Sequence, residues 1–186
     1  RKATRKCLMI MICQTTIARS TAISGIGLHT GQRINMTLRP ADAGVGIVFH
    51  RQIGDRRVSI EATSANVVDT RLATVIGQGD ARVSTVEHLL ASLAAYGVDN
   101  LHIDIDGPEV PIMDGSAAPF VSVLEEAGLK RHTVSRKFLA IRKPVSVIDG
   151  EKRATIIPSR FFRITFDIAF QHPCIALQQR SVKVTT

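Results

Sequence analysis

The residues of this 186-residue chain that are best suited to chemistry are two neighbours, Glu87 and His88. A carboxylate can take a proton from water and an imidazole nitrogen can bind zinc, so the pair can supply a general base and a metal ligand. A second interpretation assigns Glu87 no chemistry. In the pattern Ser-x-x-Glu, which begins at Ser84, the glutamate closes a capping box by bonding the serine backbone N–H. The pair also lacks the second histidine of a His-Glu-x-x-His zinc helix, so its spacing does not decide between the two.

The pair lies at the start of an expected helix. Ser84 is the expected N-cap, and Gly97 marks the expected end. Apolar residues then recur at the spacing of one helical face, namely Val86, Leu89, Leu90 and Leu93. We therefore expect Glu87 and His88 in the first turn, with their side chains facing an open surface.

Short strands around this helix predict an α+β domain. The alternating or apolar segments expected as strands are residues 34–38, 46–50, 70–76 and 101–105. Residues 51–70 are expected to be irregular. A second helix is expected up to Gly128, with Ser116 as its cap. The first domain is therefore assigned to residues 14–130, in which a β-sheet packs against two helices.

The remaining chain predicts an incomplete second domain of the same kind. Residues 129–137 are polar and basic and are expected to form a linker. Further strands are expected at residues 138–142, 145–148, 153–157 and 162–170, with no helix after them. We assign residues 137–186 to the start of a truncated second domain, and residues 1–13 to a disordered extension.

Composition excludes several classes of protein. With 45% hydrophobic and 22% charged residues, and no apolar run near the ~20 residues of a membrane span, we expect a monomeric protein without stable membrane insertion. The net charge is +8, yet residues 42–129 hold five basic and thirteen acidic residues, so no nucleic-acid partner is expected. Three cysteines without ligand spacing indicate reduced thiols and a cytoplasmic location.

Three separated motifs, taken in their order, resemble one enzyme family. They are Gly-Ile-Gly-Leu-His-Thr-Gly at residues 25–31, Val-Ser-Thr-Val-Glu-His-Leu at 83–89 and Pro-Ile-Met-Asp-Gly-Ser at 111–116, with Asn100, Glu109 and Phe-Gln-His-Pro at 170–173 also fitting. The family is UDP-3-O-acyl-N-acetylglucosamine deacetylase, a zinc amidase of lipid A biosynthesis in Gram-negative bacteria. The resemblance covers about residues 14–175 and favours the chemical interpretation of Glu87 and His88.

The resemblance implies a fold, a reaction and roles for five residues. It implies two similar domains of a sheet and two helices, the ribosomal protein S5 domain 2-like fold, with the active site between them. It implies hydrolysis of the 2-acetamido group of UDP-3-O-acyl-N-acetylglucosamine with release of acetate. In it Glu87 is the general base and His88 a Zn2+ ligand, while His29, Arg71 and Leu72 match positions that bind substrate.

The chain departs from the family after the first zinc ligand. The family's other two ligands are a His and an Asp four residues apart, and a further His is its general acid. Only His132 and His172 follow residue 102, and neither has an Asp four residues on. We therefore expect an N-terminal fragment that holds no stoichiometric zinc and shows no activity.

Four alternatives remain open at this point. His29 is equally well explained as a structural residue of a turn, and Leu72 as a core residue of a strand. The glycine-rich residues 25–31 can form a phosphate-binding loop, although no helix follows them. The whole chain can also be a basic α+β module that binds RNA, because sheet-plus-two-helix domains occur in ribosomal proteins.

Overall fold

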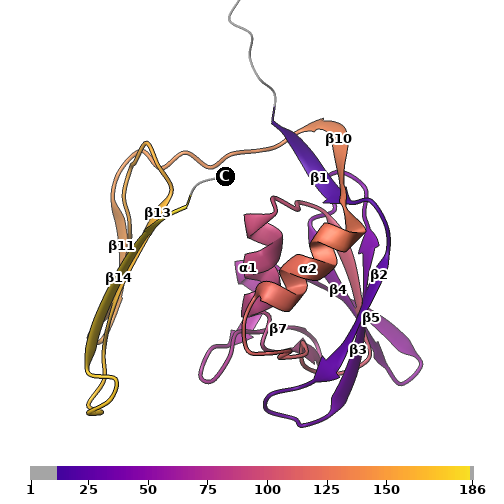
Figure 1. The fold of residues 1–186 in the computed structure, drawn as a ribbon, viewed down its shortest axis with the longest axis horizontal. Helices are drawn as coiled ribbons and strands as arrows, with labels where there is room; N and C mark the ends of the chain where they lie inside the picture. Colours follow the sequence, from indigo (N-terminus) through magenta and orange to yellow (C-terminus); the bar gives the residue numbers. More distant parts are fainter. Residues whose placement is uncertain (1–11, 185–186) are drawn as a thin grey trace, which may run out of the picture. The chain divides into compact units, whose positions relative to one another are not determined.

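The structure, a computed structural model, describes residues 12–184. Clustering of its contacts divides these residues into two compact units, one ending at Arg136 and the other beginning at Lys137 (Figure 1). The expected extension at residues 1–13 lies outside the described residues, except that Cys13 already belongs to strand β1 (Cys13–Ile17). The assignment of residues 14–130 and 137–186 to two domains stays a prediction.

A five-stranded sheet forms the base of the first unit. Its strands, in spatial order, are β2 (Thr21–Ile26), β3 (Arg33–Pro40), β9 (Leu101–Ile105), β4 (Ile47–Ile53) and β5 (Arg56–Glu61). Strand β9 runs antiparallel to β3 and parallel to β4, and all other pairs are antiparallel. The late strand β9 is therefore inserted between two strands from the first third of the chain.

Period-two alternation in these strands gives the sheet one apolar face. In β9 the side chains of Leu101, Ile103 and Ile105 are buried, whereas His102 and Asp104 point to the opposite face. Helices α1 (Glu87–Ala95) and α2 (Ala118–Ala127) cover the apolar face (Figure 1). The sheet and the helices share one core cluster, so the predicted α+β fold of the first unit, a sheet against two helices, is confirmed.

Both helices end as expected but begin later. Gly97 and Gly128 have φ angles of 66° and 67°, the left-handed conformation that ends a helix at glycine. Helix α1, however, has Val86 as its N-cap, with no side-chain cap. The prediction of Ser84 as N-cap is wrong, because its hydroxyl instead donates to the carbonyl oxygen of Pro108 at 3.2 Å.

The expected linker at residues 129–137 is wrong, because most of it forms strand β10 (Leu129–Ser135). This strand pairs antiparallel with β1, where Thr16 lies opposite Lys130 and Ile17 opposite Leu129 (Figure 1). The side chains of β10 are mostly exposed and polar, so its sequence resembles a linker. Its strand conformation comes from a partner more than a hundred residues away.

Two further expectations in the first unit are corrected. Residues 51–70 are largely regular: they contain the end of β4, the strand β5, a short 3-10 helix (Ser64–Asn66) and β6 (Val67–Asp69). The strand expected at residues 70–76 begins only at Val75 and forms β7 (Val75–Gln78), between β6 and β8 (Ala81–Val83). A three-stranded sheet therefore leads into α1, and residues 70–74 form a bend between β6 and β7.

The second unit consists of two hairpins without a buried core. They are β11 (Val145–Asp149) with β12 (Lys152–Ile156), and β13 (Arg163–Ala169) with β14 (Leu177–Lys183). Nearly every side chain is exposed, including Phe162 and Phe166. The strand expected at residues 138–142 is wrong, because this segment has no pairing partner among the described residues. No helix in the described part of the chain combines the length and apolar character needed to cross a membrane.

Removal of one core side chain should destabilise the first unit strongly. Phe120 on α2 is 1% exposed, and Phe120→Ala should lower the free energy of unfolding by about 3–5 kcal/mol, because it removes buried apolar area and leaves a cavity. Urea unfolding followed by circular dichroism measures this change. Ser122→Ala, an exposed position on the same helix, is the matched control and should change the value by less than about 0.5 kcal/mol. Equal effects of the two substitutions would contradict the described packing.

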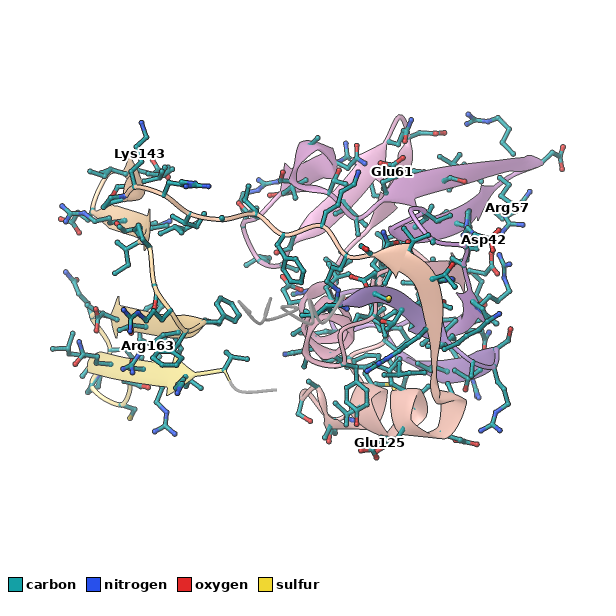
Figure 2. The ribbon with its side chains drawn as sticks, turned by 90° about the horizontal axis from the view of Figure 1, so that it is seen from above. Asp42, Arg57, Glu61, Glu125, Lys143 and Arg163 are labelled. Atoms are coloured by element: carbon teal, nitrogen blue, oxygen red, sulfur yellow. The ribbon has the colours of Figure 1, made fainter. Side chains whose placement is uncertain are left out.

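Limited proteolysis should separate the two units. Between β10 and β11 the chain has no helix or strand and carries Lys137, Arg142 and Lys143, whose side chains are exposed. Lys143 is labelled in Figure 2. Trypsin should therefore cut residues 12–184 first after Lys137 and Arg142, because local unfolding is least costly there, whereas Pro144 protects the bond after Lys143. Mass spectrometry of the early fragments identifies the sites. Earlier cleavage at Arg39 or Arg51, within sheet strands, would contradict the division into units.

Candidate functional site

Glu87 and His88 lie in the first turn of α1, at the surface of the first unit. The side chain of Glu87 is exposed and that of His88 is half-buried. Glu87 Oε1 accepts a hydrogen bond from the backbone N–H of Thr74, and the Ser84 N–H is bonded to the Pro108 carbonyl oxygen. The capping-box interpretation is therefore wrong, and the carboxylate of Glu87 is turned towards the bend at residues 70–74.

That bend carries Arg71 and Leu72, so the structure brings these residues to the same end of α1. Leu72 is 87% exposed, and the alternative that places it in a core is wrong. Arg71 is paired with Asp69 on β6: its Nη2 lies 2.7 Å from Oδ2 and its Nε donates to Oδ1 at 3.1 Å. A carboxylate, a guanidinium and an exposed apolar side chain thus share one open surface.

The ion pair between Asp69 and Arg71 shifts the pKa of both groups. Hydrogen bonds from the Arg71 side chain and backbone hold the pKa of the Asp69 carboxyl far below its usual range. The same side-chain hydrogen bond raises the pKa of Arg71. Both groups therefore stay charged at neutral pH, and the Arg71 guanidinium lies against Asp69 at the exposed surface of the bend.

His29 lies in the connection between β2 and β3, with its side chain exposed. Its backbone N–H donates to both carboxylate oxygens of Glu109, at 3.1 and 3.2 Å, and the Thr30 N–H donates to Oε2 at 3.0 Å. These amides are already bound to a carboxylate of the chain itself, so the phosphate-loop alternative is wrong. The backbone of His29 serves a structural turn, whereas its imidazole points into solvent.

Sequence reasoning matched Glu109 to the family but gave it no role. The structure buries its side chain completely and surrounds its carboxylate with donors, which include the Thr85 hydroxyl at 2.9 Å. Burial raises the pKa of Glu109, but the hydrogen bonds from His29, Thr85 and Thr30 outweigh it and leave the pKa below its ordinary value. The one available signal was a charged residue inside the apolar, proline-flanked run at residues 108–111.

His88 is suited to bind a metal, as one ligand of a larger set. Its ring makes no hydrogen bond to the described residues, and it interacts electrostatically with Asp114. Asp114 itself accepts hydrogen bonds from the Ser116 N–H and hydroxyl, at 2.9 and 2.8 Å, which order the turn before α2. Within residues 12–184, no group of three or more His, Cys, Asp or Glu side chains is placed to hold a metal.

The ion pair between Arg71 and Asp69 predicts how the Asp69 carboxyl titrates when Arg71 is removed. Arg71→Ala should raise the pKa of Asp69 towards its ordinary value of 3.8, because the strongest hydrogen bonds to the carboxylate are lost. NMR titration of the Asp69 carboxyl carbon measures the change. Arg56→Ala, which removes the guanidinium paired with Asp80, is the matched control and should leave Asp69 as it is. An unchanged Asp69 titration in Arg71→Ala would contradict the pairing.

Comparison with known proteins finds similarity to deacetylases that all carry the same name. The family model described as LpxC, UDP-3-O-acyl N-acetylglycosamine deacetylase, matches residues 14–186. Proteins named UDP-3-O-acyl-N-acetylglucosamine deacetylase are 66% identical in Syntrophotalea carbinolica, over 95% of the chain, and 59% in a Geobacter species, over 93%. A protein of the same name from Idiomarina loihiensis is 46% identical over 94% of the chain. The chain spans 57% of the length of each of these relatives.

Proposed function

This chain belongs to the family of UDP-3-O-acyl N-acetylglycosamine deacetylases, and from that premise we propose a part for it in one hydrolysis. Residues 14–186 supply the general base and one zinc ligand for cleavage of the 2-acetamido group of UDP-3-O-acyl-N-acetylglucosamine, which releases acetate in the cytoplasm. The observation that carries this proposal is the exposed Glu87 carboxylate beside the half-buried His88 imidazole at the open end of α1. The comparisons give no support to an RNA-binding module.

Glu87 is proposed to take the proton of the attacking water. Its Oε1 is held by the Thr74 N–H, and its exposed side chain leaves Oε2 able to reach a water molecule in front of the helix. The hydrogen bond from Thr74 limits the orientations of the carboxylate, so the base is presented in one direction.

His88 is proposed as one of the ligands of a catalytic zinc ion. When bound, zinc lowers the pKa of its water ligand and polarises the amide carbonyl. A catalytic zinc site normally has three protein ligands, and the described residues bring no such group together. We propose that the other two ligands and the general-acid histidine belong to the part of the relatives that this chain does not span. Residues 1–186 alone should then hold no stoichiometric zinc.

Three exposed side chains near α1 or in the glycine loop are proposed to contact the substrate. Leu72, which is 87% exposed, offers apolar surface that suits an acyl chain. Arg71 and His29 offer donors to the polar part of the substrate, and both side chains are exposed. Arg71 is also paired with the carboxylate of Asp69, so contact with the substrate has to compete with this exposed ion pair.

Substitution of Glu87 should affect catalysis, whereas substitution of His88 should affect zinc binding. Activity is measured in a completed enzyme. It consists of residues 1–186 followed by the C-terminal part of the Syntrophotalea carbinolica relative that this chain does not span. Glu87→Ala should retain zinc and lower kcat by roughly two to four orders of magnitude, since a general base is lost. His88→Ala should lower the zinc content itself. Metal analysis and an acetate-release assay measure the two effects.

The matched control removes a carboxylate far from the site. Glu61→Ala on β5, labelled in Figure 2, should leave both zinc content and kcat within about twofold, as expected for an exposed position. Normal turnover by Glu87→Ala would refute the assignment of the base. Absence of acetate release by the unsubstituted completed enzyme would refute the proposed reaction.

A further inference from the structure

The buried carboxylate of Glu109 accepts hydrogen bonds from two segments of the chain, each of which carries or adjoins a residue of the candidate site. It is buried, carries a negative charge and receives only uncharged donors: the N–H groups of His29 and Thr30 and the hydroxyls of Thr30 and Thr85, at 2.9 to 3.2 Å. A buried carboxylate is costly unless each of its oxygens is well bonded. Here both oxygens are bonded, and the donors come from two separate parts of the chain.

One of these parts is the turn that carries His29. A Cβ atom on Gly27 would overlap both Thr30 Oγ1 and Glu109 Oε2, so the turn closes directly around the carboxylate. The position of the turn is also fixed by the Gly31 N–H, which donates to the Gly27 carbonyl oxygen at 3.0 Å. Gly27 is therefore explained by an internal anion, the Glu109 side chain, rather than by a bound ligand, whereas a Cβ atom on Gly25 would instead meet Pro111 and Met113.

The other part is the segment that leads into α1. Thr85 has a φ of 57°, a left-handed conformation that is unfavourable for a β-branched residue. Its hydroxyl donates to Glu109 Oε1 at 2.9 Å, and Glu87 begins the helix two residues later. Relaxation of Thr85 to an extended conformation would turn the first residues of the helix in another direction.

The backbone around Glu109 lies between these two parts. The Ser84 N–H donates to the Pro108 carbonyl oxygen at 2.9 Å, and the Val110 N–H donates back to the Ser84 carbonyl oxygen at 3.0 Å. On the other side, the Ile112 N–H donates to the Ile26 carbonyl oxygen at 3.0 Å. One short segment thus holds the glycine turn and the helix entry together, with the Glu109 carboxylate directed into both.

We propose that Glu109 is a positioning residue for the deacetylase site, which fixes the turn of His29 and, through Thr85, the direction of Glu87. This inference rests on the proposed function only where it concerns catalysis. Its structural part holds for any role of these residues. Loss of the carboxylate should loosen both segments together while the sheet stays intact.

Hydrogen exchange of the 186-residue chain, followed by mass spectrometry, tests the structural part. In Glu109→Gln, the amide group cannot accept all the bonds, and peptides covering residues 27–32 and 84–88 should exchange at least about tenfold faster. Peptides covering β9 should exchange as in the unsubstituted chain. Glu61→Gln, an exposed change of the same chemistry, should alter neither set. Equal acceleration in all peptides, or none in the two segments, would overturn the inference.

The completed enzyme tests the catalytic part. Glu109→Gln should lower kcat by roughly 10- to 100-fold without loss of zinc, because the base is misplaced rather than removed. Thr85→Val, which replaces the hydroxyl with a methyl group of similar size, should also lower kcat, whereas Thr85→Ser, which keeps the hydroxyl, should retain most of the activity. Melting temperatures are measured alongside, so that kcat is compared among folded enzymes.

The outcomes separate this inference from the proposed function. If Glu87→Ala abolishes turnover while Glu109→Gln and Thr85→Val leave kcat unchanged, the positioning role is wrong and the proposed function stands. If Glu87→Ala turns over normally, the proposed function fails, and hydrogen exchange alone decides whether Glu109 orders the two segments.

Discussion

The burial of one face of strand β9 is the constraint on which the first unit depends. Leu101 and Ile103 are fully buried, each contributing about 1.5–3 kcal/mol, in the same core cluster as Leu89 and Phe120 of the two helices. The strand connects α1 to the segment that holds Glu109, and its end is bonded to β3 through the Asp106 carboxylate, which accepts the Asn35 N–H at 2.8 Å. The register of β9 therefore fixes where the candidate site is assembled.

The spacing of neighbouring residues predicted those elements whose conformation depends on nearby residues. The helix that carries Glu87 and His88, its glycine end and the alternation of β9 all follow from the spacing of neighbouring residues. Strand β10 was mistaken for a linker because its own side chains are polar, and only β1 makes it a strand. In the second unit, the apolar segment at residues 138–142 resembles a strand, yet it finds no pairing partner within residues 12–184, and sequence spacing does not reveal this.

The reactive groups of the candidate site could be proposed from the sequence, but their supports could not. Residue type and spacing left Glu87 and His88 undecided, and the resemblance of three motifs to the deacetylase family favoured their chemical interpretation. Leu72 gains meaning only from its exposure in the structure. Glu109 was missed because its contacts join positions 80 residues apart for His29 and 24 apart for Thr85. A buried charge satisfied by neutral donors leaves no periodic signal, since its partners depend on how segments meet after folding.

The pairing of β1 with β10 also affects how the protein is made. Gln14 and Ser135 are bonded across 121 residues, so the edge of β1 has no native partner until β10 has been synthesised. At roughly 5–20 residues per second, this delay lasts about 6–24 s. During that time Thr16 and Ile17, which are buried in the finished unit, stay accessible on the growing chain. Strand β1, the first strand among the described residues, is thus paired only after the rest of the first unit has been made, and a chaperone that binds short apolar segments could bind it in the meantime.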